Sequence, residues 1–319
     1  MKVIEALDDD GCCCLSFEIL PPNKGTGIEA IYRALDPLVP FNPAFINVTY
    51  HQPHVEFKET REGLKKIYRN KRPGTVGICA AIKYKYGIET VPHFICGGFN
   101  KFETEDALID LHFLGMNNVF IVRGDPAPGN NMFIPEPDGH VYAHQLVEQV
   151  ANMNKGKYLE ELENQSPTDF CIGVAGYPEK HFESPNIDFD ILNLKRKIEA
   201  GADYIITQMI FDAEKYIHYV QLLRENGISL PVIPGIKPIS SLQQITSIPR
   251  NFYVSIPADL TKKLMECRTD AQVKKVGIAH TIELIQKLLD FGVPGIHVFT
   301  MSNPEPVVEV LKQVIVYEK

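Results

Sequence analysis

Short apolar segments rich in β-branched and aromatic residues recur along this chain, and stretches with helical periodicity lie between them. Continuous apolar strands are typical of a parallel sheet that is covered on both faces, because neither face of such a strand meets water. Strands that alternate with helices predict parallel strands joined by helical crossovers. The predicted strands are Cys14–Ile19, Ala44–Tyr50, Thr75–Ala81, Asn118–Arg123, Phe170–Gly176, Tyr204–Gln208, Pro231–Ile236 and Gly295–Thr300.

The intervening stretches are amphipathic and predict helices. Eight such units in 319 residues suit an α/β fold of the closed (β/α)8 or TIM-barrel type, with an extra helical insertion before the last strand. An open, doubly wound sheet is the alternative. No composition shift marks a linker, so we expect residues 1–319 to form a single domain. The predicted helices are Ile28–Leu38, Val55–Arg69, Thr104–Leu114, Tyr142–Met153, Asp188–Ala200, Ala213–Glu225, Leu242–Ser247, Val273–Leu289 and Pro306–Val316.

Composition and charge exclude several classes of protein. Hydrophobic residues make up 45% of the chain, which is enough for a large core, and the formal net charge is −8. The only dense basic run, Lys65–Arg72, is interpreted as the end of a helix whose dipole it complements, so we expect no nucleic-acid partner. No apolar stretch approaches about 20 residues and the N-terminus is acidic, so we expect a cytoplasmic protein without membrane contact.

The chain has seven cysteines, and Cys12, Cys13 and Cys14 are adjacent. Neighbours on a strand point to opposite faces, so the three do not form a simple disulfide framework, and a reducing compartment is expected. Metal ligation is one interpretation. Burial as small hydrophobic side chains is favoured, because no CxxC pair accompanies them, and we expect no metal.

A barrel of this type carries its chemistry where the carboxyl ends of the strands meet the following loops. Glu18 lies among apolar neighbours in SFEILPP, where a carboxylate loses hydration and its protonated form is favoured, as a general acid requires. An ion pair with a barrel lysine or arginine is the alternative. Polar residues near strand ends are Glu18, Thr49, His93 (after a loop), Arg123, Gly124, Asp125, Tyr177, Gln208 and Thr300.

Two further segments carry candidate binding residues. In IVRGDPAPG, Gly124 allows a sharp turn that holds Asp125 against a ring or substrate, or Asp125 makes only an ordinary turn. Arg123 either binds phosphate or pairs with Asp125. In DFDILNLKRK, Asp188 is the expected N-cap. Asp190, Asn193 and Lys197 then share one helix face beside an apolar stripe, which suits a ligand with hydroxyls and phosphates, or else forms a solvated salt-bridged face.

Common catalytic motifs are missing from the sequence. No GxGxxG follows the first strand, and GxxxxGK[ST], GxSxG and HExxH are all absent. Rossmann, Walker, serine-hydrolase and zincin chemistry therefore have no support.

Seven segments, in order, resemble the methylenetetrahydrofolate reductase family over most of the chain. They are SFEILPP, FINVTYHQP, PHFICGG, FIVRGDPAPG, VAGYPEKHFESPN, DILNLKRKIEAGADYIITQMIFD and PVIPGIKPIS. The resemblance implies a (β/α)8 barrel with non-covalent FAD. It also implies reduction of 5,10-methylenetetrahydrofolate to 5-methyltetrahydrofolate by NADH or NADPH in a ping-pong sequence, supplying methyl groups for methionine synthesis. A homo-oligomer is also implied.

By the same resemblance, Glu18 is the general acid that opens the folate ring. Asp125 touches the folate and tunes the flavin, so Glu18 and Asp125 are the catalytic candidates. Gln208 and Gln244 match positions that contact folate or nicotinamide. The implied FAD contacts are Thr49, Tyr50, His93, Arg123, Gly124, Asp125, Tyr142, Ala143, Tyr177, His181, Asp190, Asn193, Arg196 and Lys197.

The chain also departs from the family pattern. Asn303 stands where the family commonly has an arginine that reaches the folate. The chain ends soon after the last predicted helix, so we expect no regulatory domain and no inhibition by adenosylmethionine. Two other functions stay open: another barrel flavoenzyme similar to proline dehydrogenase, and a pseudoenzyme that binds folate or flavin without turnover.

Overall fold

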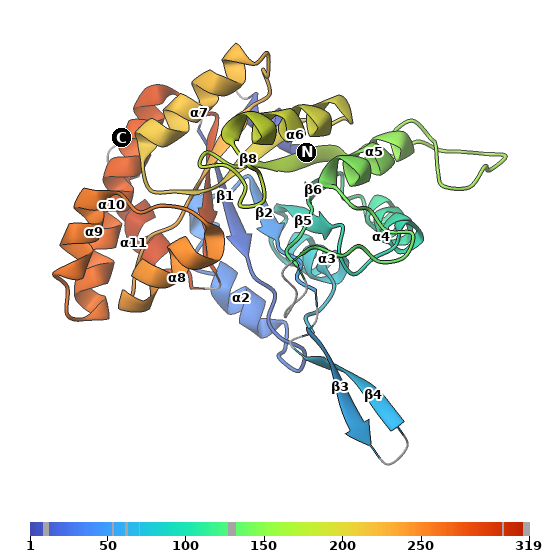
Figure 1. The fold of residues 1–319 in the computed structure, drawn as a ribbon, viewed down its shortest axis with the longest axis horizontal. Coiled ribbons are helices and arrows are strands. Elements are labelled where there is room, and N and C mark those ends of the chain that lie inside the picture. The colour runs from blue at the N-terminus through green and yellow to red at the C-terminus, as the bar shows by residue number, and fades with distance from the viewer. Residues whose placement is uncertain are drawn as a thin grey trace.

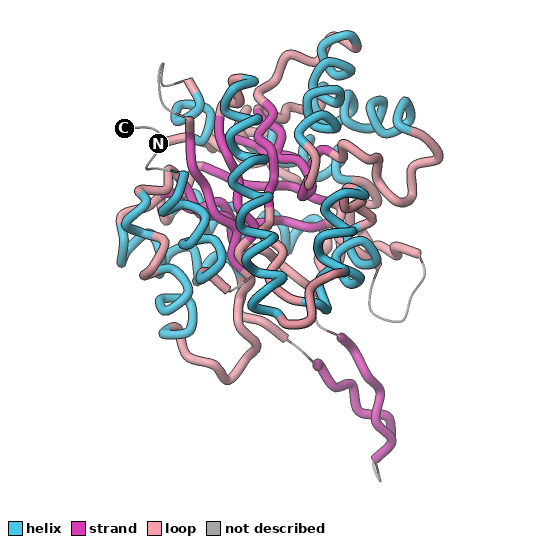
Figure 2. Tube along the Cα trace, turned by 90° about the vertical axis from the view of Figure 1, so that its left-hand side faces the viewer, coloured by secondary structure: helices cyan, strands magenta, loops and turns pink. Residues whose placement is uncertain are grey.

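A closed barrel of eight parallel strands forms the centre of the molecule (Figures 1 and 2). The computed structural model describes residues 1–8, 13–52, 54–60, 63–69, 71–126, 132–301 and 303–314. Around the barrel the strands follow the order β1-β10-β9-β8-β7-β6-β5-β2, which confirms the predicted (β/α)8 fold. The barrel strands are β1 (Cys14–Ile19), β2 (Phe45–Val48), β5 (Glu89–Ile95), β6 (Asn118–Val122), β7 (Cys171–Gly176), β8 (Tyr204–Ile210), β9 (Val232–Ile236) and β10 (Gly295–Phe299).

Helices surround these strands and bury their outer faces (Figure 2). Throughout the described ranges, each helix is too short or too polar to span a bilayer. The helices are α1 (Val3–Leu7), α2 (Glu29–Leu35), the short 3-10 helix η1 (Val39–Phe41), α3 (Thr75–Tyr86), α4 (Lys101–Phe113), α5 (Ala143–Met153), α6 (Ile187–Glu199), α7 (Ala213–Glu225), α8 (Leu242–Phe252), α9 (Ala258–Met265), α10 (Asp270–Phe291) and α11 (Glu305–Val314).

The barrel interior is packed with side chains at its N-terminal end. The rings of Phe45 and Phe120 both lie against Tyr204, at centroid distances of 6.5 and 6.4 Å. Val3 of α1 is 1% exposed and belongs to the same cluster, and its backbone N–H donates to Asn118 Oδ1 (2.8 Å). Helix α1 therefore closes this end, and the opposite end of the barrel is left to hold a ligand.

Helices α8, α9 and α10 lie between β9 and β10, which confirms the predicted helical insertion. Leu260 and Leu264 of α9 share a buried cluster with Met209, Phe211 and Phe299 from the ends of β8 and β10. The insertion thus packs on the carboxyl ends of these strands and forms one wall of the region where ligands bind in such barrels.

The prediction of a helix over Val55–Arg69 is wrong. This segment forms an antiparallel hairpin of β3 (His54–Thr60) and β4 (Gly63–Arg69), which projects from the body (Figures 1 and 2). Gly63 begins β4 with φ +112°, a conformation that glycine adopts without strain and that ends any helix. The basic run Lys65–Arg72 consequently lies on β4 and the segment after it, and not at a helix end.

The prediction of a third strand at Thr75–Ala81 is also wrong. Thr75–Ala81 begins α3, which continues to Tyr86 and ends at Gly87 with φ +69°. A short apolar run does not distinguish a buried strand from a buried helix, which explains the error. The third barrel strand is β5, whose Pro92 lacks an N–H donor and disguised the strand in the sequence. His93 therefore lies within β5 and not after a loop.

Two of the three adjacent cysteines, Cys13 and Cys14, are among the described residues. Cys12 lies outside the described residues, while Cys14 is 7% exposed and packs in the interior cluster at the start of β1. The described cysteines form no disulfide with one another. Across the described ranges, His, Cys, Asp and Glu side chains nowhere gather in a group of three or more that would hold a metal ion.

Candidate active site

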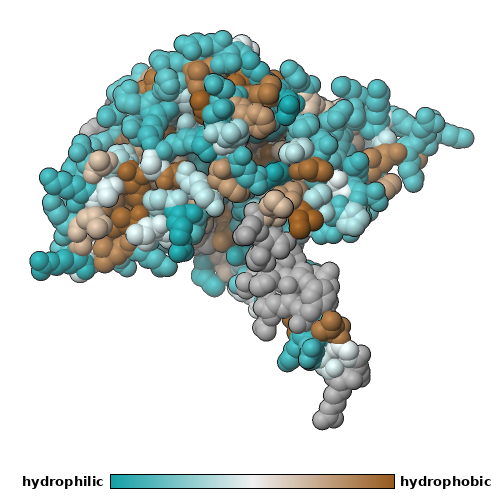
Figure 3. Space-filling model, viewed as in Figure 1, coloured by the Kyte–Doolittle hydropathy of each residue, from teal (hydrophilic) through white to brown (hydrophobic). Residues whose placement is uncertain are grey.

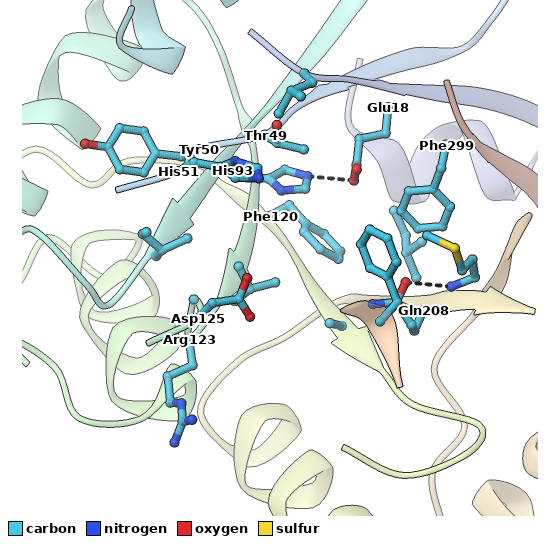
Figure 4. A pocket seen from close by; sticks show the side chains of 18 of the residues that line it. Glu18, Thr49, Tyr50, His51, His93, Phe120, Arg123, Asp125, Gln208 and Phe299 are labelled. Atoms are coloured by element: carbon cyan, nitrogen blue, oxygen red, sulfur yellow. Dashed lines mark hydrogen bonds and ion pairs between the residues drawn. The ribbon is translucent and has the colours of Figure 1, made fainter. Parts of the chain in front are cut away.

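A cavity of about 420 Å³ opens at the carboxyl ends of the barrel strands (Figure 4). Its volume is in the usual range for small-molecule sites. The structure brings ten of the candidate residues into its lining: Glu18, Thr49, Tyr50, His93, Arg123, Gly124, Asp125, Tyr177, His181 and Gln208. Seven others lie outside that lining: Tyr142, Ala143, Asp190, Asn193, Arg196, Lys197 and Gln244.

Glu18 projects from β1 into the cavity between two histidines. Its Oε2 lies 3.6 Å from Nε2 of His93 and 3.8 Å from Nε2 of His297 (Figure 4 shows the first contact). The Glu18 side chain is 13% exposed. None of the described lysines and arginines lies within ion-pair distance of Glu18. The alternative prediction of an ion pair with a barrel lysine or arginine is therefore wrong for the described residues.

His93 is uncharged at neutral pH. Burial lowers its pKa to about 4, against a smaller opposing effect of the Glu18 carboxylate. Asn47 Nδ2 lies 3.0 Å from His93 Nε2, and this hydrogen bond ties the ring to β2. Glu18 therefore faces a ring that carries no positive charge at neutral pH.

His297 is a site residue that the sequence reasoning missed. It is fully buried on β10, and its Nδ1 lies 2.8 Å from Ser16 Oγ on β1. Its Nε2, which points towards Glu18, has no hydrogen-bond partner. A histidine inside the continuous apolar run GIHVFT was the available signal, because an inward-facing polar side chain in a barrel strand needs a polar neighbour.

The β6 end carries Arg123, Gly124 and Asp125. Gly124 has φ +85°, a backbone conformation in which any side chain is strained, and a Cβ there would make a tight contact of 3.2 Å with Ile95 Cβ. The Arg123 guanidinium pairs with Glu183 and not with Asp125, and lies 4.9 Å from the Phe133 ring. The Arg123 and Asp125 side chains lead in different directions, and that of Asp125 lies beside the cavity (Figure 4).

Helix α6 places a polar row against the barrel, next to β7. Lys197 Nζ donates to Ala175 O (2.6 Å), and burial lowers the Lys197 pKa to about 8. Asp190 is 8% exposed and accepts from Ser184 Oγ (2.8 Å), and burial raises its pKa. The N-cap of the helix is Asn186, whose side chain accepts from Phe189 N, so the expectation of Asp188 as N-cap is wrong.

His181 lies on the cavity side of this row, and Arg196 lies on the exposed side of α6. His181 packs against the Tyr177 ring at 4.8 Å, and burial together with nearby Arg123 and Lys197 lowers its pKa to about 4. Arg196 donates to Asn193 Oδ1 (3.1 Å) on the exposed side of α6. Arg196 and Lys197, in the last turn of α6, are the positive charges here that suit a phosphate-bearing ligand.

The remaining candidates either lie away from the cavity or form hydrogen bonds with residues close to them in the sequence. Tyr142 and Ala143 begin α5, which packs on α6, and Tyr142 is 51% exposed. Gln208 lines the cavity while its Oε1 accepts from Met209 N (2.8 Å; Figure 4). Gln244 Oε1 accepts from Ser240 N (2.7 Å) at the start of α8. Asn303 donates its backbone N–H to Thr300 O (2.9 Å).

Several aromatic and charged residues complete the site without having been predicted. Phe252 from the end of α8, Phe299 from β10 and His51 after β2 line the cavity. Glu183 neutralises Arg123 from the β7–α6 loop. Their positions depend on loop paths and on the inserted helices, which short-range patterns do not predict.

Comparison with known proteins identifies the family of the chain. The sequence model of methylenetetrahydrofolate reductase matches residues 3–315. The chain is 30% identical over 311 residues to methylenetetrahydrofolate reductase 2 of Saccharomyces cerevisiae, covering 95% of this chain and 48% of the yeast protein. It is 31% identical over 292 residues to 5,10-methylenetetrahydrofolate reductase of Escherichia coli, covering 91% of this chain and 87% of that protein.

A solved Clostridium thermocellum protein that binds two copies of 5-methyl-5,6,7,8-tetrahydrofolic acid shares the fold, with a TM-score of 0.58, 15% identity and 99% coverage of both chains. The chain spans about half the length of the eukaryotic relatives that it matches, and most of the length of the E. coli relative. A family match across nearly all its residues, together with the bacterial relative, confirms the resemblance seen in the sequence: the chain belongs to the methylenetetrahydrofolate reductase family.

Proposed function

We propose that this protein binds FAD and reduces 5,10-methylenetetrahydrofolate to 5-methyltetrahydrofolate, with NADH or NADPH as the electron source. The two substrates would use one cavity in turn, which gives ping-pong kinetics, and the product would supply methyl groups for methionine synthesis. Names of relatives support the use of a reduced nicotinamide, since NADH and NADPH each appear among them. A cytoplasmic homo-oligomer fits the same proposal.

The position of Glu18 carries the proposal. A carboxyl group at the end of β1, 13% exposed and flanked by His93 and His297, is placed to give a proton to a substrate in the cavity. Neither of these two neighbours is a lysine or an arginine. Protonation of a ring nitrogen of the folate would open the ring and leave an electrophilic methylene carbon.

The residues present fit FAD. The cavity walls combine apolar side chains with the polar groups of Thr49 and Asp125, as a flat heteroaromatic ring requires. Beyond the cavity, Arg123, Lys197 and Arg196 would hold the pyrophosphate, and Tyr142 and Ala143 on the neighbouring helix would contact the far end. When bound, FAD would supply the hydride chemistry.

The chain's own residues would then orient and stabilise the reactants. Asp125 would lie near the cationic folate that forms on ring opening, and its negative charge would stabilise that cation. Gln208 offers a side-chain amide to folate or nicotinamide. Neutral His181 would leave the phosphate charge to the lysine and arginines.

The test is a pair of anaerobic half-reactions. Purified protein should carry flavin whose absorbance bleaches with NADH or NADPH and recovers with methylenetetrahydrofolate. Glu18→Gln should keep the bleaching and lose the recovery, whereas Glu214→Gln, at an exposed position on α7, should keep both. Equal loss of both half-reactions in Glu18→Gln would contradict the proton-donor role.

The same assay distinguishes the other two functions. Bleaching by proline without any response to folate would indicate an enzyme similar to proline dehydrogenase. Flavin that binds but is never reoxidised by folate would indicate a pseudoenzyme.

A further inference from the structure

The hairpin of β3 and β4, here called the arm, projects from the barrel as an isolated ribbon. Its two strands pair only with each other, and both views show it extending away from the body (Figures 1 and 2). A two-stranded hairpin alone is marginally stable in water. A ribbon of this length is therefore expected to gain stability from a surface that covers it.

The charges on the arm indicate what kind of surface that is. Lys58 and Lys65 are cross-strand partners and both are exposed. Like charges directly opposite each other destabilise a ribbon, unless a negative surface lies against them. Leu64, next to Lys65, is 69% exposed, so an apolar contact is also available beside the lysine pair (Figure 3). The arm thus presents positive charge together with an apolar side chain.

This charge contrasts with that of the body. Residues 54–72 contain seven Lys and Arg against three Glu, while the whole chain carries −8. All of the excess negative charge therefore lies outside the arm. A second copy of this chain offers the opposite charge at the same concentration as the arm itself.

One exposed segment of the body matches the arm in both respects. Residues 159–163 read LEELE, and Glu160, Glu161 and Glu163 are exposed. Leu159 and Leu162 are 38% and 50% exposed. The loop that contains them runs out from the end of α5 in Figure 1, away from the arm of the same chain.

This segment is held in place by α4. The Leu159 N–H donates to Glu105 Oε2 (2.9 Å). The same helix exposes Glu103, Asp106 and Asp110, which extend the negative surface. The loop is therefore an anchored acidic and apolar surface.

We propose that the arm of one copy docks on residues 159–163 of a second copy, with Lys58 and Lys65 against the glutamates and Leu64 against the leucines. Reciprocal docking of two arms gives a closed two-fold dimer with the same contact made twice. This inference does not depend on the proposed enzymatic function.

Sedimentation velocity of the full chain tests the proposal. The wild type should sediment as a dimer at about 0.1 M salt and dissociate towards a monomer at about 1 M salt, where the screening length falls from about 10 Å to about 3 Å. Lys58→Glu with Lys65→Glu should be a monomer. This double change keeps the like-charge repulsion across the ribbon and reverses only the charge presented to a partner.

A charge swap identifies the partner surface. Glu160→Lys, Glu161→Lys and Glu163→Lys together should also give a monomer, and combining them with the two arm changes should restore the dimer. Lys262→Glu with Lys263→Glu, exposed on α9, is the matched control and should leave the dimer intact. Replacement of residues 54–69 by a short Gly-Ser linker should give a monomer even if the charge variants disturb the arm itself.

Three results would overturn the inference. A wild type that is monomeric at low salt, or arm variants that keep the wild-type mass, would show that the arm does not mediate assembly. Failure of the charge swap to restore the dimer would remove residues 159–163 as the docking surface. Nucleic acid that co-purifies with the wild type and is lost in the arm variants would show that the arm binds a different partner.

Discussion

Nε2 of His297 lies 3.8 Å from Oε2 of Glu18, while Nδ1 of the same ring lies 2.8 Å from Ser16 Oγ. Glu18 and Ser16 both belong to β1, and His297 to the adjacent β10. The serine thus fixes the orientation of the ring, and the nitrogen without a hydrogen-bond partner faces the carboxyl group. In the proposed mechanism His297 would therefore act as a positioning residue for the Glu18 carboxyl group.

His297→Phe should slow flavin reoxidation by folate roughly 10- to 100-fold, because general acid catalysis contributes factors of about 10² to 10⁴. Flavin reduction by nicotinamide should change little. The pH profile of reoxidation should shift, and Ser16→Ala should move it in the same direction by a smaller amount. An unchanged profile with both half-reactions slowed alike would indicate only a packing role.

Acid should destabilise the fold through buried histidines. The His93 pKa is lowered by burial from 6.5 to about 4 and that of His181 likewise, so between those pH values the unfolded chain binds more protons than the folded one. Stability therefore falls as pH drops from 6.5 to 4, by up to roughly 3 kcal/mol for His93 alone. Urea unfolding of His93→Asn should show a weaker pH dependence over this window than the wild type.

Cofactor retention should depend on pH through Lys197. Burial lowers the pKa of Lys197 to about 8. As pH rises through this value, Lys197 loses the positive charge that attracts phosphate. FAD affinity of the wild type, measured by flavin fluorescence, should fall between pH 7 and 9. Lys197→Met should bind FAD roughly 10- to 100-fold more weakly at pH 7, as expected for loss of a charged contact, with a flatter dependence.

Lys195→Met is the control for that measurement, because Lys195 lies on the same helix but bonds Asn226 (3.2 Å) instead of the site. Equal losses in the two variants would assign the effect to the helix and remove Lys197 from the cofactor site.

Gly124→Ala should destabilise the protein and weaken flavin binding. A side chain at φ +85° costs about 1–2 kcal/mol, and the close approach of Ile95 adds to it. Gly115→Ala, at φ +66° with open space around it, tests the backbone cost alone. Thermal unfolding should show a larger loss for Gly124→Ala, and equal losses would mean that Ile95 adjusts freely.

The order of strands and helices was largely readable from the sequence, because most of the strands and helices have clear periodicity and glycine ends. One element was assigned to the wrong class, and the strand that follows it was not predicted. The apolar run at Thr75 is a helix, and the strand at Glu89 contains Pro92. The hairpin of β3 and β4 was missed because its alternating pattern lies in a highly charged segment that also suits a helix.

The site residues likewise fall into those that the sequence predicts and those that it does not. Residues at strand ends, such as Glu18 and Thr49, reach the cavity because the barrel brings all strand ends together. Partnerships across the fold, such as that of Arg123 with Glu183, depend on the path of a loop and have no signal in the sequence. The same holds for Phe252, which reaches the cavity from the inserted helices.

Pairing of β1 with β10 joins Cys14 to Gly295 and Glu18 to Phe299, residues almost a whole chain length apart. During synthesis the first strand must therefore wait, with one edge open, until residues 295–299 have left the ribosome. The walls of the cavity come from both strands. A fragment that stops before Gly295 should therefore lack the site altogether, and not merely bind more weakly. It should also expose an unpaired strand edge, which makes it prone to aggregate.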